Sequence, residues 1–134
     1  MIFATGIPNP KFACDNLTTI VNESKKNGVD PMVVISMVYQ DSKWEKKSMG
    51  KFAPTLEEGI AKLANSLNLF INSSRSKRKR YLSAICTYKR GFSVCRNRGN
   101  KHYVAGMSYA VFIKRRAEFM RNVYDGFEKV LLEQ

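Results

Sequence analysis

The spacing of apolar positions predicts a chain built from helices. The clearest pattern lies in residues 55–70, where apolar side chains recur at spacings of four, three, four and three. They are Leu56, Ile60, Leu63, Leu67 and Phe70. This spacing places them on one face of an amphipathic helix. Thr55 followed by Glu58 forms a capping box, so we predict that the helix begins directly after Thr55.

A second pattern begins at Asp30-Pro31, which suits an N-cap and the first position of a helix. The apolar run from Met32 to Val38 that follows has almost no polar interruption. Its β-branched residues would also suit a buried strand, but the cap and the length favour a helix. A helix that is apolar on all sides is a central one, surrounded by its neighbours. It ends in residues 39–44, where polar side chains meet aromatic ones.

The remaining segments also favour helices joined by polar loops. We predict a first helix over about 15–26, ended by Asn27-Gly28, and a short helix over 81–88 with Leu82 and Ile85 inward. A last helical segment runs from 102 to about 132, and Lys114-Arg115-Arg116 either interrupts it or lies on its solvent face. Residues 1–12 are an extended lead-in, and 45–52, 72–80 and 91–101 are loops. The fold class is therefore all-α: a single domain over 1–134, with five to six helices.

The composition fits this globular class. The chain has 134 residues, of which 44% are hydrophobic and 25% charged. No apolar run approaches the roughly 20 residues that span a bilayer. The start of the chain, residues 1–6, lacks the basic and apolar regions of a signal peptide. We therefore expect cytoplasmic synthesis, with delivery as a virion component or by a secretion machine if the protein acts at the periplasm or cell wall.

The formal charge of +12 is concentrated in the second half of the chain. Residues 1–70 carry 8 Lys and Arg against 7 Asp and Glu, whereas residues 71–134 carry 15 against 4. Such a half attracts polyanions: nucleic acid, anionic lipid or acidic wall polymers. The densest basic cluster comprises Arg75, Lys77, Arg78, Lys79 and Arg80. It is either a solvated linker or a contact for phosphates or an acidic polymer; no nucleic-acid fold signature accompanies it.

The cysteine and histidine content argues against a metal site. Cys14, Cys86 and Cys95 form no C-x-x-C pair, and His102 is the only histidine. We predict no metal and no cofactor. Cys86 and Cys95 are either a disulfide pair or free thiols, and buried free thiols in a reducing compartment are the favoured interpretation.

Three stretches occur in an order that resembles the soluble lytic transglycosylases and goose-type lysozymes. Residues 28–44 resemble the family's "gvdp" helix start, apolar helix and Glu-Ser followed by an aromatic residue. Residues 84–91, AICTYKRG, are similar to Ala-x-x-Ala-Tyr-Asn-Ala-Gly, and His102-Tyr103-Val104 to a following Tyr-Val segment. The resemblance covers roughly residues 15–125. It implies a lysozyme-like fold that acts on the MurNAc-GlcNAc bond of peptidoglycan glycan strands.

Two departures from the family pattern bear on activity. Asp41 stands at the position of the catalytic Glu, and the Gly-x-x-Gly-Leu-Met-Gln segment that lines the sugar cleft is missing. An Asp carboxyl lies about 1.5 Å further back than a Glu carboxyl. Displacements near 1 Å cost on the order of 100-fold in rate. An enzyme with Asp41 as general acid would therefore be a slower one.

The resemblance implies a site around Asp41. A general acid needs an apolar pocket, and Asp41 follows a wholly apolar helix, although a residue that merely closes this helix is an equal alternative. Tyr88 would hold the acid, Ser42 would support it, and Trp44 would stack on a sugar; a half-buried tyrosine and a core tryptophan are the plainer roles. Tyr103 is a further substrate-side residue or a packing one.

Two functions therefore stand beside each other. The first is a peptidoglycan-directed lysozyme-like domain, active or formerly active. The second is a catalytically inactive structural or virion protein on the same scaffold, whose basic half binds nucleic acid or an acidic protein partner. A helical adaptor unrelated to lysozyme is a third, weaker alternative.

Overall fold

The computed structural model describes residues 10–42, 55–72 and 76–132, with side chains described from residue 16 to residue 125 of these ranges. In these ranges the chain is an all-helical single domain of six helices without strands. The helices are α1 (Pro10–Asn27), α2 (Pro31–Ser42), α3 (Leu56–Asn68), α4 (Lys77–Arg90), α5 (Phe92–Cys95) and α6 (Tyr103–Leu132). The predicted fold class and number of helices are confirmed.

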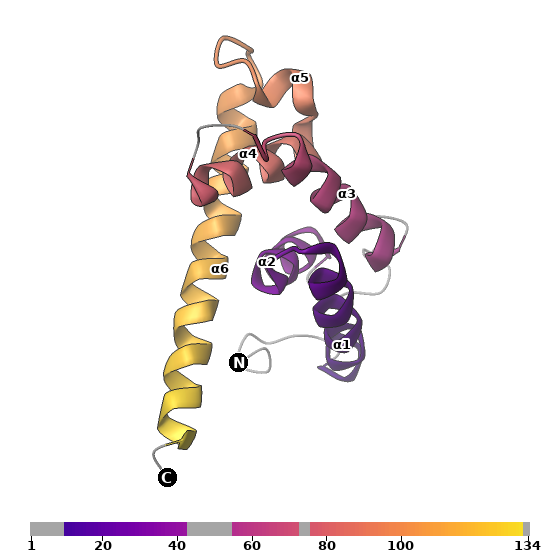
Figure 1. Ribbon diagram of the computed structural model, residues 1–134, viewed down its shortest axis with the longest axis vertical. Helices are drawn as coiled ribbons and strands as arrows, with labels where there is room; N and C mark the ends of the chain where they lie inside the picture. The colour runs from indigo at the N-terminus through magenta and orange to yellow at the C-terminus, as the bar shows by residue number, and fades with distance from the viewer. Residues whose placement is uncertain (1–9, 43–54, 73–75, 133–134) are drawn as a thin grey trace.

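The long helix α6 organises the molecule. It runs along one edge from end to end, with α4 and α5 near its first turns and α2 beside its middle (Figure 1). Helix α3 lies between α4 and α1 and packs on both of them. The predicted central helix is the observed α2: every residue from Met32 to Val38 is buried. No helix in the described ranges is long and apolar enough to cross a membrane.

The helix starts and stops follow the predicted local signals. Asp30 caps α2, since its Oδ1 accepts a hydrogen bond from the Met32 N–H at 2.9 Å. Thr55 caps α3 through the Glu58 N–H at 3.1 Å. Gly28 ends α1 with a φ of 70°, the left-handed conformation that favours glycine at this position. The α3 stripe also faces inward as predicted, with Ile60, Leu63 and Phe70 buried.

Three predicted boundaries were wrong. Helix α1 begins at Pro10 instead of residue 15, because proline is well tolerated in a first helical turn. The predicted linker over 72–80 ends earlier: α4 begins at Lys77, with Ser76 as its N-cap, so most of the basic cluster is helical. The predicted loop over 91–101 contains the short helix α5.

Helix α6 continues through its basic segment without a break. Lys114-Arg115-Arg116 lies inside the helix, on turns whose inward positions are Ile113 and Ala117. Near the end of its described side chains, Val123 and Tyr124 are 41% and 48% exposed. These apolar residues follow a helical spacing, but here α6 extends beyond the helices that would cover them (Figure 1).

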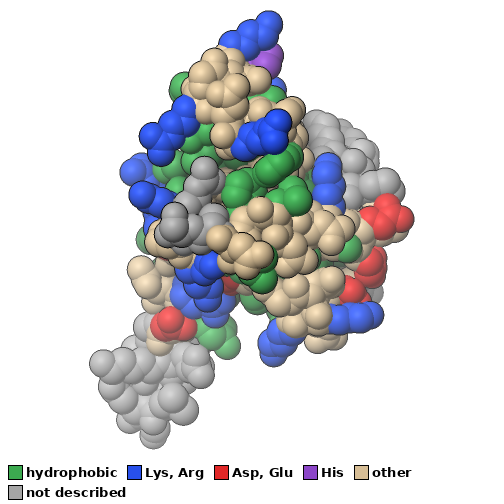
Figure 2. All heavy atoms as spheres, turned by 45° about the horizontal axis from the view of Figure 1, so that its top comes forward, with side chains coloured by type: hydrophobic (Ala, Val, Ile, Leu, Met, Phe, Trp, Pro, Cys, Tyr) green, Lys and Arg blue, Asp and Glu red, His purple; other side chains and the backbone are tan. Residues whose placement is uncertain are grey.

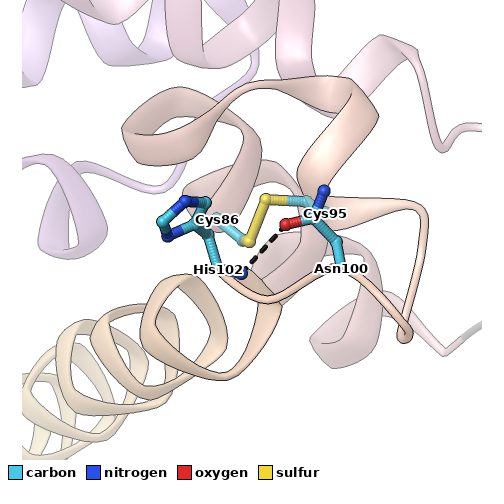
Figure 3. The surroundings of a disulfide bond; sticks show 4 residues. All are labelled: Cys86, Cys95, Asn100 and His102. Atoms are coloured by element: carbon cyan, nitrogen blue, oxygen red, sulfur yellow. Dashed lines mark hydrogen bonds between the residues drawn. A yellow bond between two sulfur atoms is a disulfide. The ribbon is translucent and has the colours of Figure 1, made fainter.

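The favoured interpretation of the cysteines as free thiols was wrong. Cys86 of α4 and Cys95 of α5 form a disulfide (Figure 3). Both residues are buried, so the bond fixes α5 against the end of α4. The separation of nine residues allowed this pairing, but only the turn at Gly91, with a φ of 94°, folds the chain back far enough to form it.

Candidate functional site

Asp41 occupies the next-to-last position of α2 and meets side chains from α4 and α6. Its side chain is only 5% exposed. Its Oδ1 accepts a hydrogen bond from the Tyr109 hydroxyl at 3.2 Å and lies 3.6 Å from the Lys89 Nζ. Its Oδ2 is buried and has no hydrogen-bond partner among the described residues. Asp41 is thus a largely buried carboxylate, with one oxygen paired and the other buried without a described partner.

Two tyrosine hydroxyls are held in their neutral form near this carboxylate. Burial, and secondly the negative charge of Asp41, raise the pKa of Tyr88 to about 12. Burial raises the pKa of Tyr109 even further, with contributions from the charge of Asp41, the hydrogen bond donated to it and the neighbouring Tyr88. Both phenols therefore remain hydrogen-bond donors at physiological pH.

Lys89 and Gln40 complete a small polar hollow. The hollow has a volume of about 580 Å³ and is lined by Gln40, Asp41, Lys89 and Tyr109. The Lys89 ammonium also lies 5.0 Å from the centre of the Tyr109 ring, and its side chain is 40% exposed. Gln40 is fixed by a hydrogen bond from Arg116 at 3.2 Å. The arrangement is a carboxylate at the base of an open polar hollow, with a cation at its rim.

The structure brings only some of the predicted site residues together. Tyr88 lies close enough to Asp41 for the charge of the carboxylate to raise its pKa. Ser42 is buried, and its hydroxyl donates at 2.6 Å to the Val38 carbonyl of its own helix, so this contact serves the helix. Tyr103 lines a different hollow, on α6. Trp44 lies outside the described residues.

Sequence reasoning missed Lys89 and Tyr109. Lys89 stands at the Asn position of the resembled Ala-x-x-Ala-Tyr-Asn-Ala-Gly motif, so the substitution itself was a signal that could have identified it. Tyr109 is 68 residues from Asp41 in sequence and has no local pattern that connects the two. Only the packing of α6 beside the end of α2 brings it to the carboxylate.

The predicted polyanion cluster divides into structural and free cations. Arg78 forms two hydrogen bonds with Glu118 of α6, at 3.1 and 3.2 Å, and Arg80 donates to the Ile71 carbonyl at 3.3 Å. Lys77 and Lys79 are exposed in the first turn of α4. Arg75 lies outside the described residues.

A second basic surface lies around α5. We call Arg90, Arg96, Arg98 and Lys101 the basic tip; all four are exposed and form no ion pair with a described carboxylate. The turn that carries them is fixed by the disulfide and by two asparagines: Asn97 accepts from the Gly99 N–H at 3.0 Å, and Asn100 from the His102 N–H at 2.9 Å (Figure 3).

The sequence around the basic tip is free of acidic residues over a long range. Between Glu58 and Glu118 the chain has 14 Lys and Arg and no Asp or Glu. Basic side chains and the histidine lie at the top of the molecule in Figure 2, and the acidic side chains visible on that face lie away from it. On this face the basic side chains also continue down the left side and to the lower edge (Figure 2).

Comparison with known proteins identifies no relative: no protein-family model, no curated protein and no solved structure matches the chain. Among the described residues, no group of three or more His, Cys, Asp or Glu side chains lies close enough together to hold a metal ion.

Proposed function

We propose that the protein is a peptidoglycan-directed, lysozyme-like domain whose glycan site is the hollow at the end of α2, with Asp41 as its acid. The carrying observation is that the Asp41 carboxyl, 5% exposed beside this hollow, lies near Tyr88. These two residues belong to the two motifs that carry the resemblance to lytic transglycosylases. They are 47 residues apart in sequence, so their meeting is a consequence of the fold.

In this proposal Asp41 donates a proton to the oxygen that leaves as the glycosidic bond breaks, and the N-acetyl group of the substrate assists at the sugar carbon, as the resemblance implies. Tyr109 orients the carboxyl through the hydrogen bond to Oδ1, and Oδ2 is buried without a hydrogen-bond partner among the described residues. A single carboxyl suffices in this proposal, because the N-acetyl group of the substrate takes the place of a second carboxylate as the nucleophile.

In the free protein the Lys89 ammonium forms an ion pair with the Asp41 carboxyl. The 3.6 Å separation and the 40% exposure of Lys89 leave it free to swing into solvent when a sugar enters. The Cys86–Cys95 disulfide further supports action at the wall, since disulfides persist in oxidising compartments.

Muropeptide release from purified sacculi tests the proposal. We expect slow release by the wild type and its loss in Asp41→Asn, which preserves an acceptor for Tyr109. Asp41→Glu should raise the rate by up to about 100-fold, because it moves the carboxyl forward by roughly 1.5 Å. Ser108→Ala, on the exposed face of α6, is the control and should leave the rate unchanged. Absence of wild-type release, or release that survives in Asp41→Asn, contradicts the catalytic role.

A second candidate function is binding of nucleic acid without catalysis. The basic tip favours it, because four exposed cations without a described carboxylate partner are available to phosphates. The affinity for a DNA duplex should fall linearly with salt on logarithmic axes. Arg96→Ala with Arg98→Ala should reduce that slope by about 2, since each phosphate contact contributes about 0.9. Lys25→Ala with Lys26→Ala removes the same charge from the end of α1 and should have little effect. No binding at low salt eliminates this function.

A further inference from the structure

The outward face of α6 carries an apolar stripe that no described helix covers. Inward positions Gly106, Ala110, Ile113 and Ala117 are buried. At 3.6 residues per turn, a second set of residues lies roughly opposite them on the same helix. We call this set the outer stripe: Val104, Ser108, Val111, Phe112, Arg115 and Phe119.

The large apolar side chains of the outer stripe are strongly exposed to solvent. Val104 is 71%, Phe112 47% and Phe119 67% exposed. Together with neighbouring residues the stripe lines an open hollow of about 750 Å³. The solvent face of a helix is normally polar, and a contiguous exposed apolar patch indicates an interaction surface.

The stripe is already arranged for binding. The Arg116 guanidinium lies 4.5 Å from the centre of the Phe112 ring and 5.0 Å from that of Tyr39, and its hydrogen bond to Gln40 anchors it. Phe112 is thus supported from the side. Val104 and Phe119 are 15 residues apart, so the stripe is roughly 22 Å long, about the length of a four-turn helix.

The position of Arg115 determines the kind of partner. It lies between Phe112 and Phe119, in the C-terminal part of the stripe, and has no described carboxylate partner. A covering surface that brought no carboxylate would bury this charge unpaired, at a large cost in free energy. The partner must therefore present apolar side chains together with an acidic group opposite Arg115.

A second copy of the chain that docked with its own outer stripe does not meet this requirement. The part of α6 that would face Arg115 contains no Asp or Glu from Tyr103 to Ala117, and Glu118 is bound by Arg78. Each copy would also carry a charge of +12, so the two would repel.

A lipid surface fits less well than a helix. Helices that lie in a membrane keep their charged residues on the face opposite the apolar one. Arg115 is at the centre of the apolar face, so insertion would push its charge toward the acyl chains. A helix partner, in contrast, can place one carboxylate opposite Arg115 and apolar side chains on either side.

From these observations we infer that the outer stripe of α6 is a docking groove for an acidic, amphipathic helix of a protein partner. The helix is about 15 residues long, with apolar residues at spacings of three and four and at least one Glu or Asp opposite Arg115. This inference does not depend on the chemistry proposed for Asp41; the two surfaces share only the hydrogen bond from Arg116 to Gln40.

A designed peptide tests the inference on the intact protein. The probe is a fluorescent 18-residue helix with Leu at spacings of three and four and Glu elsewhere; the control peptide has the same composition in scrambled order. We expect the helix to bind at least tenfold more tightly than the scrambled peptide. Phe112→Ser with Phe119→Ser should weaken binding by about 30-fold, the effect of losing central anchors.

Two further variants make the test specific. Leu69→Ser with Ile71→Ser removes equally exposed apolar side chains at the end of α3 and should leave binding unchanged. Arg115→Glu should weaken binding of the Glu peptide and strengthen binding of the same peptide with Lys in place of Glu. Circular dichroism verifies that each variant is folded.

Three outcomes would overturn the inference. Equal affinity for the helical and scrambled peptides would reduce the effect to general charge attraction. Sedimentation showing a dimer that Phe112→Ser with Phe119→Ser dissociates would assign the stripe to a second copy. Binding to phosphatidylglycerol vesicles that needs Phe112 and Phe119, without selective peptide binding, would assign it to a lipid surface.

Discussion

At the residue scale, Asp41 depends on neighbours from three helices. Its own helix places the carboxyl at the end of an apolar segment, and α4 and α6 supply the lysine and the tyrosine that contact it. A carboxylate with this little exposure needs such partners, because an unpaired buried charge is costly. The same contacts hold the ends of α2, α4 and α6 together.

The buried tyrosines predict a loss of stability at alkaline pH. Because burial raises the pKa of Tyr88 from 10.0 to about 12, the unfolded chain ionises first. The stabilising contribution is complete below pH 10 and disappears as the pH rises through about 12. The urea midpoint should fall over this range, and less steeply in Tyr88→Phe. Tyr124→Phe, which removes a half-exposed phenol, is the control; an unchanged slope in Tyr88→Phe would contradict the prediction.

A titration of the phenols tests whether Asp41 and Tyr88 interact. Asp41→Asn removes the negative charge, so the pKa of Tyr88 should fall below its value of about 12 but stay above the ordinary value, because burial is the larger cause. Tyrosinate absorbance measured against pH, with Tyr88→Phe to identify the contribution, provides the measurement. A titration identical to that of the wild type would mean that the two groups are not in contact.

At the element scale, α4 and α6 pack unusually closely at Gly106. A Cβ at this position would lie 2.6 Å from the Cys86 sulfur and 3.0 Å from the Arg90 Cγ. The sulfur is fixed by its disulfide and cannot yield easily. Glycine is therefore needed here for close approach, in the first turn of α6.

Gly106→Ala should consequently destabilise the protein in spite of its better helix propensity. Overpacking costs about 1–3 kcal/mol, and the propensity gain of about 1 kcal/mol offsets part of this. We expect a net loss of up to about 2 kcal/mol in urea unfolding. Ser108→Ala is matched for helix propensity on the exposed face and should be neutral or slightly stabilising. A more stable Gly106→Ala variant would disprove the close contact.

The disulfide should contribute measurably to stability. Closing a loop of nine residues restricts the unfolded chain, an effect of roughly 2–3 kcal/mol. Cys86→Ser with Cys95→Ser, or reduction of the wild type, should lower the free energy of unfolding by this amount. Cys14→Ser retains the pair and serves as the control. Equal stability of the reduced and oxidised proteins would contradict this expectation.

At the scale of the whole molecule, stability depends on the buried helix α2. Met37 is 0% exposed, so Met37→Ala should leave a cavity and lower the free energy of unfolding by about 2–5 kcal/mol. Val104→Ala, at a residue that is 71% exposed, should change it by less than about 0.5 kcal/mol. Similar losses at both positions would mean that α2 is not the centre of the core.

Positive charge is concentrated in one continuous part of the chain. The basic tip and Arg115 of the outer stripe belong to the stretch between Glu58 and Glu118, which contains no Asp or Glu. The basic tip faces solvent at one end of the molecule, while the hollow at Asp41 lies where α2, α4 and α6 meet. Binding of a polyanion and chemistry at Asp41 therefore use separate surfaces, and their variants can be tested independently.

The sequence alone determined five of the six helices and several of their ends, but it missed α5 and the starts of α1 and α4. The caps at Asp30 and Thr55, the stop at Gly28 and the central position of α2 were all readable, because capping and hydrophobic periodicity act over a few residues. Ser76 was missed as a cap since the basic residues after it did not form an apolar stripe. The possibility of pairing Cys86 with Cys95 was visible, but the choice between disulfide and thiols was not.

Only the tertiary structure decided which distant side chains meet. Tyr109 contacts Asp41, Lys89 pairs with it, and Arg115 remains unpaired within an apolar stripe, all because α6 lies beside α2 and α4. Periodicity shows which face of a helix is apolar but not which helix covers it. Function is inferred from burial, charge pairing and hollows. These depend on which helices pack against each other, and that packing is decided by contacts between residues far apart in the chain.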